Sequence, residues 1–210
     1  MTRREPLVLL AIGAALLAWS GIGVHDRGTW IMEVAPIFIA VPLLVATARR
    51  FPLTPLAYRL IFVHALILML GGHYTYAQVP LGFWMERVFG FMRNDYDRIG
   101  HFAQGFVPAI IAREILIRRS PLKQGKWLFF IVTSICLAIS ACYEFIEWWS
   151  ALIGGDSAEA FLGTQGDPFD TQADMLMALI GALAAQFLLS RLHDRQLQKL
   201  QTLSRPITRV

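Results

Sequence analysis

Charged residues are scarce in this sequence. Asp, Glu, Lys and Arg together make up 16% of the 210 residues, whereas a soluble globular domain carries roughly 25%. Hydrophobic residues make up 56%, and they are gathered in long apolar runs that alternate with short charged stretches. This layout excludes an ordinary soluble domain and is typical of an all-α fold, a polytopic membrane helical bundle.

Cysteine and recognisable catalytic motifs are scarce as well. The two cysteines, Cys136 and Cys142, fall in one apolar run, which excludes a disulfide framework and a zinc finger. The sequence contains no H-E-x-x-H motif, and no Ser or Cys nucleophile has an obvious His partner. The net charge of +4 comes from basic residues clustered in particular loops, so we expect no nucleic-acid partner.

Six apolar stretches predict transmembrane helices in a single domain over residues 1–192, followed by a basic tail over residues 193–210. The stretches cover about residues 7–24, 33–48, 56–76, 99–117, 127–148 and 171–192. Each can cross a hydrocarbon layer of ~30 Å, although the second is short and contains two prolines. The first is longer than the ~7–15-residue core of a signal peptide, so we interpret it as a retained span.

The distribution of Lys and Arg predicts the orientation of these spans. Of the 19 basic residues, 15 fall in the N-terminus, the 49–59 and 113–126 loops and the C-terminal tail, and 4 fall on the opposite side. The positive-inside rule then places both termini in the cytoplasm. The remaining outer segment, residues 77–96, is predicted to form either an amphipathic helix on the membrane surface or an ordered loop.

Ionisable and polar residues gather at the predicted outer ends of four spans. Asp97, His101 and Gln104 share one helix face, because their spacing is i, i+4 and i+7. The other residues of this kind are Tyr143, Glu144 and Glu147 near the end of the fifth span, Asp170 and Asp174 at the start of the sixth, and His73 at the end of the third. Each ionisable group costs about 2.5–3.5 kcal/mol in lipid, so we expect them to line a shared polar pocket that opens to the periplasmic side.

These residues suggest roles within such a pocket. The candidate catalytic residues are His101, Glu144, Asp174 and Glu147. The candidate substrate-binding residues are Asp97, Gln104, Tyr143, Gln165, Asp167, Asp170 and His73. The candidate metal ligands are His101, Glu144, Asp170 and Asp174, a set that suits zinc, manganese or magnesium.

Simpler interpretations exist for several of these residues. Asp97 and Asp170 each precede an apolar run, where helix N-caps belong. Glu147 lies beside two tryptophans and fits headgroup water, and His73 fits an interfacial histidine bonded to a backbone carbonyl. At the inner end of the fourth span, the i, i+4 spacing of Glu114 and Arg118 predicts a structural ion pair. In the last span, Gly181 and Ala185 predict close helix packing.

Three stretches carry a resemblance to a known family. "DRIGHFAQGF", "YEFIEWW" and "GTQGDPFDTQADMLMALIGA" resemble the bacterial inner-membrane YjdF family, a domain of unknown function. The pattern also resembles the VanZ-like superfamily, in which Asp97, His101, Glu144 and Asp174 with Gly181 would be the corresponding positions. Ala178 stands where that superfamily tends to have Asn, and the loop before the last span has Gln165-Gly166-Asp167 where it tends to have Arg. The resemblance implies an inner-membrane location and a focal polar site, and it supplies no reaction.

Three functions remain open on the sequence. The first is a metal-dependent or acid/base site that acts on a lipid-linked or other amphiphilic envelope substrate. The second is a proton-coupled carrier, because membrane-embedded carboxylates and histidine are the usual relay groups. The third is a non-catalytic envelope or lipid-binding factor. Membrane lipid is the expected partner in each case.

Overall fold

A computed structural model describes residues 4–154 and 165–204 of the chain. All regular elements in these two ranges are helices, which confirms the predicted all-α class. The elements are α1 (Glu5–Ser20), α2 (Arg27–Thr47), α3 (Pro55–Tyr74), the 3-10 helix η1 (Tyr76–Gln78), α4 (Pro80–Phe89), α5 (Tyr96–Arg119), α6 (Lys126–Gly154) and α8 (Asp170–Ser204).

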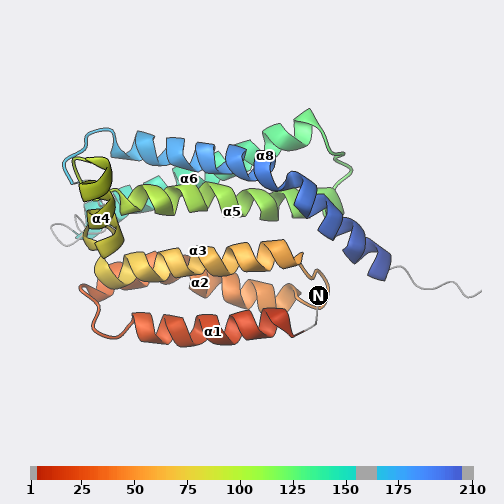
Figure 1. The fold of residues 1–210 in the computed structure, drawn as a ribbon, viewed down its shortest axis with the longest axis horizontal. Helices are drawn as coiled ribbons and strands as arrows, with labels where there is room; N and C mark the ends of the chain where they lie inside the picture. The colour runs from red at the N-terminus through yellow and green to blue at the C-terminus, as the bar shows by residue number, and fades with distance from the viewer. Residues whose placement is uncertain (1–3, 155–164, 205–210) are drawn as a thin grey trace, which may run out of the picture.

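Four of the described helices are long and apolar enough to cross a membrane, namely α2, α3, α6 and α8. Helix α1 is apolar and shorter, with 16 residues. Helix α5 has 24 residues, and charged side chains occupy both its first and its last turn. The count of six spans and the orientation of the termini therefore stay predictions, although the start of α1 and the end of α8 lie at the same end of the bundle (Figure 1).

The helix that contains the second predicted span begins before residue 33. Helix α2 begins at Arg27 and has 21 residues. Asp26 caps it, because its carboxylate accepts a hydrogen bond of 2.6 Å from the backbone N–H of Thr29. Pro36 and Pro42 both lie inside the helix, which transmembrane helices tolerate when neighbouring groups satisfy the freed backbone carbonyls.

The last helix also extends beyond its predicted end at residue 192. Helix α8 continues to Ser204, because residues 193–204 contain no Gly or Pro that would end it. His193 and Leu197 are buried in this continuation. The first part of the segment expected as a basic tail is therefore helical, while residues 205–210 lie outside the described residues.

The six longest helices fall into two groups (Figure 1). In one group, α1 and α2 both pack against α3, and in the other α5, α6 and α8 pack against one another; α3 and α5 join the groups. The closest pair is α5 and α8. A Cβ atom at Gly105 would clash with the backbone of Ala178, and one at Gly181 would clash with the carbonyl oxygen of Phe102. Small residues thus let these two backbones touch, as predicted for Gly181 and Ala185.

A buried ionic cluster ties the two groups together at the end of the bundle near the N-terminus. Glu114 on α5 is fully buried and accepts hydrogen bonds from the backbone N–H and the hydroxyl of Thr54, at 3.0 and 2.7 Å. Arg118 contacts Glu114 at 2.6 Å, which confirms the predicted ion pair. His193 on α8 lies 3.1 Å from the same carboxylate, and its other ring nitrogen accepts from Arg113 at 3.0 Å. We call this set the Glu114 cluster.

Candidate functional site

The polar residues of α5, α6 and α8 meet at the opposite end of the bundle, beside α4. In Figure 1 this end carries the start of α5, the end of α6 and the start of α8. Because α5 and α8 run in the opposite direction to α6, the first turns of two helices and the last turns of the third come to one depth. We call the side chains gathered here the His101 cluster.

His101 lies at the centre of this cluster and is 4% exposed. Its Nε2 atom lies 3.4 Å from Oδ1 of Asp97 and 3.8 Å from Oδ1 of Asp174. Its Nδ1 atom lies 3.2 Å from Oε1 of Gln104 and 3.7 Å from Oε1 of Glu144. Three helices therefore direct a carboxylate or amide oxygen toward one imidazole ring.

The side chains from α6 leave hydrogen-bonding capacity unused. Glu144 is 6% exposed, and its Oε1 atom has no hydrogen-bond partner among the described residues. The hydroxyl of Ser140, one turn earlier, is buried and has no partner in the same part of the chain. Buried polar groups are normally satisfied, so these two neighbouring oxygens are available to bond water, an ion or a ligand.

Helix α2 contributes an acid that the sequence did not single out. Glu33 is 4% exposed, and one of its carboxylate oxygens accepts a hydrogen bond of 3.5 Å from the hydroxyl of Tyr143 on α6. Glu147, one turn after Tyr143, is also buried rather than placed in headgroup water. Glu33 was recognisable only as the single charged residue at the start of an apolar span.

Two arginines were missed as site residues, because the charge count treated them as outer-loop cations. Arg98 contacts Asp174, Asp170 at 2.8 Å and Asp167 at 3.2 Å. Arg93 contacts Asp170 at 2.5 Å and Asp95 at 3.1 Å. Both arginines therefore neutralise the acids at the start of α8.

Arg93 lies in the loop before α5, outside the spans, and its acidic partners favour its charged form. Burial opposes the charge of the guanidinium, but the hydrogen bond and the negative charge of Asp170 outweigh burial and raise the pKa of Arg93. The arginine is thus fixed in its charged form beside the start of α8.

Two of the predicted substrate-binding residues lie apart from His101. The Nδ1 atom of His73 is 2.9 Å from the carbonyl oxygen of Ser20, and its ring stacks on Trp19, so it holds α3 against α1. Gln165 donates to the carbonyl oxygen of Asn94 at 2.8 Å and accepts from its N–H at 3.3 Å, so it joins two loops. Asp167 lies at the rim, where it binds Arg98 and accepts from the N–H of Phe169.

The geometry favours a metal-ligand set slightly different from the predicted one. One ligand atom each from Asp97, His101 and Asp174 lie within 4.8 Å of one another. Asp170 contacts both Arg93 and Arg98, whereas of these two arginines Asp174 contacts Arg98 alone, so Asp170 is the less suited of the two acids to bind a cation. The Oε1 atom of Glu144 lies 3.7 Å from Nδ1 of His101, whereas Asp97 and Asp174 face Nε2, so Glu144 lies outside this set of ligand atoms.

Comparison with known proteins places the chain in a family. A family profile described as "Predicted membrane protein (DUF2238)" matches residues 5–195. The chain belongs to the DUF2238 family. Among similar proteins, the "Inner membrane protein YjdF" of Escherichia coli (strain K12) is 55% identical over 203 residues, which cover 95% of this chain and 97% of that protein. No solved structure matches.

Membership of DUF2238 confirms the predicted resemblance to the YjdF family and identifies an integral, multi-pass protein of the inner membrane. The matched range covers α1 to the middle of α8 and so contains the whole His101 cluster. The wider relation to VanZ-like proteins stays a prediction. The "GTQGD" motif begins at Gly163 and Thr164, which lie outside the described residues.

Proposed function

We propose that the His101 cluster is a divalent-cation site at the periplasmic face of the inner membrane, where it carries out acid/base chemistry on an amphiphilic envelope substrate. The observation that carries the proposal is the convergence of Asp97, His101 and Asp174, whose ligand atoms lie within 4.8 Å of one another in a largely buried place. One imidazole nitrogen with carboxylate oxygens suits zinc or manganese. A bound cation there would polarise a substrate oxygen.

The charges around the ring support a cation. Asp97, Glu144, Glu147 and Glu33 lie near His101, whereas Arg93 and Arg98 contact Asp167, Asp170 and Asp174. Excess carboxylates packed together in the membrane require positive charge or protons. Glu144, whose Oε1 atom has no hydrogen-bond partner in the described ranges, is placed to accept a proton from a substrate or a water molecule.

The amphiphilic substrate follows from the surroundings of the cluster. Trp148 and Trp149 on α6 and Trp84 on α4 are about half exposed at the same end of the bundle. Tryptophan prefers the membrane–water interface. A site at this depth is reached most easily by a molecule with a polar head at the interface and an apolar tail in the membrane.

The first experiment measures metal in the full-length protein, purified in detergent, incubated with zinc or manganese and desalted. We expect about one ion per chain in the wild type and its loss in His101→Ala. His73→Ala is the matched control, because this histidine lies at the same end outside the cluster, and it should keep the metal. A metal-free wild type, or equal retention by His101→Ala and His73→Ala, would overturn the cation site.

A second experiment tests the chemistry. The protein would be incubated with an envelope lipid extract, and lipid species that change would be followed by mass spectrometry. We expect a metal-dependent change that is lost in Glu144→Gln, although this variant keeps its metal. A change in the lipid species that persists in Glu144→Gln would show that Glu144 is not the base.

One observation favours an alternative, the proton-coupled carrier. The hydrogen bond between Glu33 and Tyr143 joins one helix group to the other. In a carrier, this hydrogen bond would break and form again as the two groups move relative to each other. Proton flux in proteoliposomes that is lost in Asp174→Asn and independent of metal would favour this alternative.

A further inference from the structure

Helices α1 and α2 are held together at one end and separated over most of their length. Near the His101 end, the indole N–H of Trp30 on α2 donates to the hydroxyl of Ser20 on α1 at 3.1 Å. The carbonyl oxygen of the same serine contacts His73 on α3. Beyond this point both helices pack against α3 rather than against each other, so a groove opens between them with α3 as its floor.

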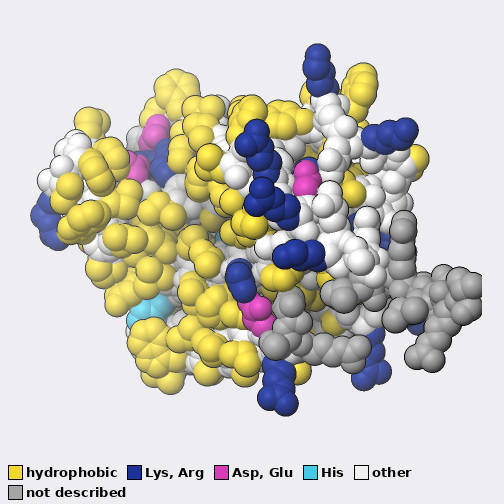
Figure 2. Space-filling model, turned by 45° about the vertical axis from the view of Figure 1, so that its right-hand side comes forward, with side chains coloured by type: hydrophobic (Ala, Val, Ile, Leu, Met, Phe, Trp, Pro, Cys, Tyr) yellow, Lys and Arg dark blue, Asp and Glu magenta, His cyan; other side chains and the backbone are white. Residues whose placement is uncertain are grey.

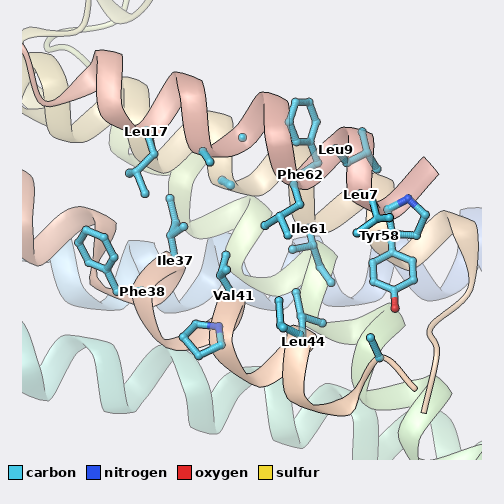
Figure 3. Close-up of a pocket in the computed structure, with 18 of the residues that line it drawn as sticks. Leu7, Leu9, Leu17, Ile37, Phe38, Val41, Leu44, Tyr58, Ile61 and Phe62 are labelled. Carbon is cyan, nitrogen blue, oxygen red and sulfur yellow. The ribbon is translucent and has the colours of Figure 1, made fainter. Parts of the chain in front are cut away.

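The groove has a volume of about 570 Å³ and walls that are almost entirely apolar. Figure 3 shows Leu17 of α1 and Ile37 of α2 pointing toward one another, with Val41, Leu44, Ile61 and Phe62 further along. The lining reaches from Pro6 to Leu17 on α1, which is about 16 Å at 1.5 Å per residue. That length is the depth of one leaflet, half of a hydrocarbon layer of about 30 Å.

The groove ends in polar groups where it reaches the N-terminal end of the bundle. Arg49 and Tyr58 line it there. Arg59, which is close by in sequence, is paired with Glu5 at 2.6 Å, whereas Arg49 has no acidic partner in the part of the chain that the structure describes. The hydroxyl of Tyr58 accepts a hydrogen bond of 3.3 Å from the N–H of Leu53, so its own O–H remains able to donate.

Basic residues dominate this end of the molecule. In Figure 2 the right-hand end of Figure 1 comes forward, and most of the visible Lys and Arg side chains lie at that end. Hydrophobic side chains cover much of the rest of this face. Arg4 and Arg50 lie with Arg49 near the start of α1 and the end of α2. Such a surface attracts anionic lipid headgroups, and a basic residue that contacts the headgroup contributes about a fivefold gain in affinity.

We propose that this groove binds one anionic phospholipid. An acyl chain lies between α1 and α2 on the floor of α3, and the phosphate accepts hydrogen bonds from Arg49 and Tyr58. The groove suits an anionic lipid better than an apolar helix, because its apolar walls end at Arg49, which offers a phosphate a charged donor. The volume also falls in the ~300–1,000 Å³ range of small-ligand sites.

The chain offers matched pairs of residues for the test. Ala14 lines the groove and its neighbour Ala15 does not, and both are exposed. Arg49 lines the groove and its exposed neighbour Arg50 does not. Ala14→Trp would therefore fill the groove, and Arg49→Gln would remove its positive charge. Ala15→Trp and Arg50→Gln make the same chemical changes outside the groove.

The experiment is native mass spectrometry of the full-length protein in detergent, with phosphatidylglycerol or phosphatidylcholine of identical chains added. We expect one phosphatidylglycerol per chain at saturation, retained about fivefold better than phosphatidylcholine. Retention should fall about fivefold in Arg49→Gln and further in Ala14→Trp, and stay at the wild-type level in both controls.

Three results would overturn the lipid site. The first is equal retention of the two lipids by the wild type. The second is equal loss in each variant and its control. The third is a homodimer that Ala14→Trp dissociates, which would assign the groove to a second copy of the chain. None of these results bears on the His101 cluster, whose metal content is measured separately.

Discussion

The two buried ionic clusters of this protein contain similar residues and differ in how completely they are paired. In the Glu114 cluster, Glu114 is bonded by Thr54, Arg118 and His193, and Arg113 also contacts Asp194 at 2.7 Å. In the His101 cluster, oxygens of Glu144 and Ser140 have no partner among the described residues, and the carboxylates lie 3.4–3.8 Å from the imidazole. Pairing within the described residues is therefore more complete in the first cluster than in the second.

The difference teaches how a structural cluster is distinguished from a functional one. A fully paired network holds helices in place, because removing any member leaves another charge buried and alone. An incompletely paired cluster contributes less to stability and keeps atoms available for a ligand. We therefore expect substitutions at the two ends to separate stability from function.

The largest expected effect belongs to Glu114→Ala. It leaves His193 and Arg118 without their carboxylate, and it should lower the free energy of unfolding by about 3–5 kcal/mol. Denaturant titration in detergent, followed by circular dichroism, measures this. Glu5→Ala is the control, because it breaks the more exposed pair with Arg59 and should cost less than about 1 kcal/mol. Similar losses in both variants would contradict the structural role of the Glu114 cluster.

Arg98→Gln should have an intermediate effect. It removes the charged hydrogen bonds to Asp170 and Asp174, which we expect to lower the free energy of unfolding by about 1.5–3 kcal/mol. The same titration measures the loss. A change below about 0.5 kcal/mol would mean that Arg98 does not fix the start of α8.

A substitution away from both clusters provides a reference for the size of these losses in stability. Asp26→Ala removes the N-cap of α2 and should cost about 1 kcal/mol. The hydrogen bond from the backbone N–H of Thr29 lowers the pKa of Asp26, so its contribution is present above the unfolded-state pKa and is lost as the pH falls through the lower folded-state pKa. Unfolding titrations at neutral and acidic pH check this, and a cap contribution that grew on acidification would be inconsistent with it.

The smallest change in stability is expected for Glu144→Gln. The amide replaces a carboxylate whose Oε1 atom is buried and unpaired in the described ranges, so the free energy of unfolding should change by less than about 1 kcal/mol or increase. The measurement is the same titration. A loss as large as that of Glu114→Ala would remove the contrast between the two clusters.

Helix periodicity explains which parts of the site were predictable. The i, i+4 spacing that joins Asp97 to His101 places them on one face of any helix, and the structure has them in contact. Close helix packing on α8 was also indicated by Gly181 and Ala185, although the sequence did not identify α5 as the partner. These are local properties that need no knowledge of which helices are neighbours.

Other contacts depend on the packing of distant segments and could not be predicted. Glu33 reaches Tyr143 only because α2 lies near α6, and no pattern in either helix indicates that pairing. Arg98 lies in the first turn of α5, and its long side chain could extend either toward the bundle or toward the solvent. His193 lay beyond the predicted end of the last span, so its burial against Glu114 had no signal in the hydropathy.

Helix α8 gives the molecule an axial connection between its two ends. It is unbroken over 35 residues, and Asp174 and His193 are separated by about 28 Å along its axis. Helix α5 likewise carries His101 near one end and Glu114 near the other, and the two helices touch backbone to backbone at Gly105 and Ala178. Sliding one of these helices along the other would therefore break contacts at both ends of the bundle together, and the close approach of Gly105 to Ala178 and of Gly181 to Phe102 fixes the register of the pair.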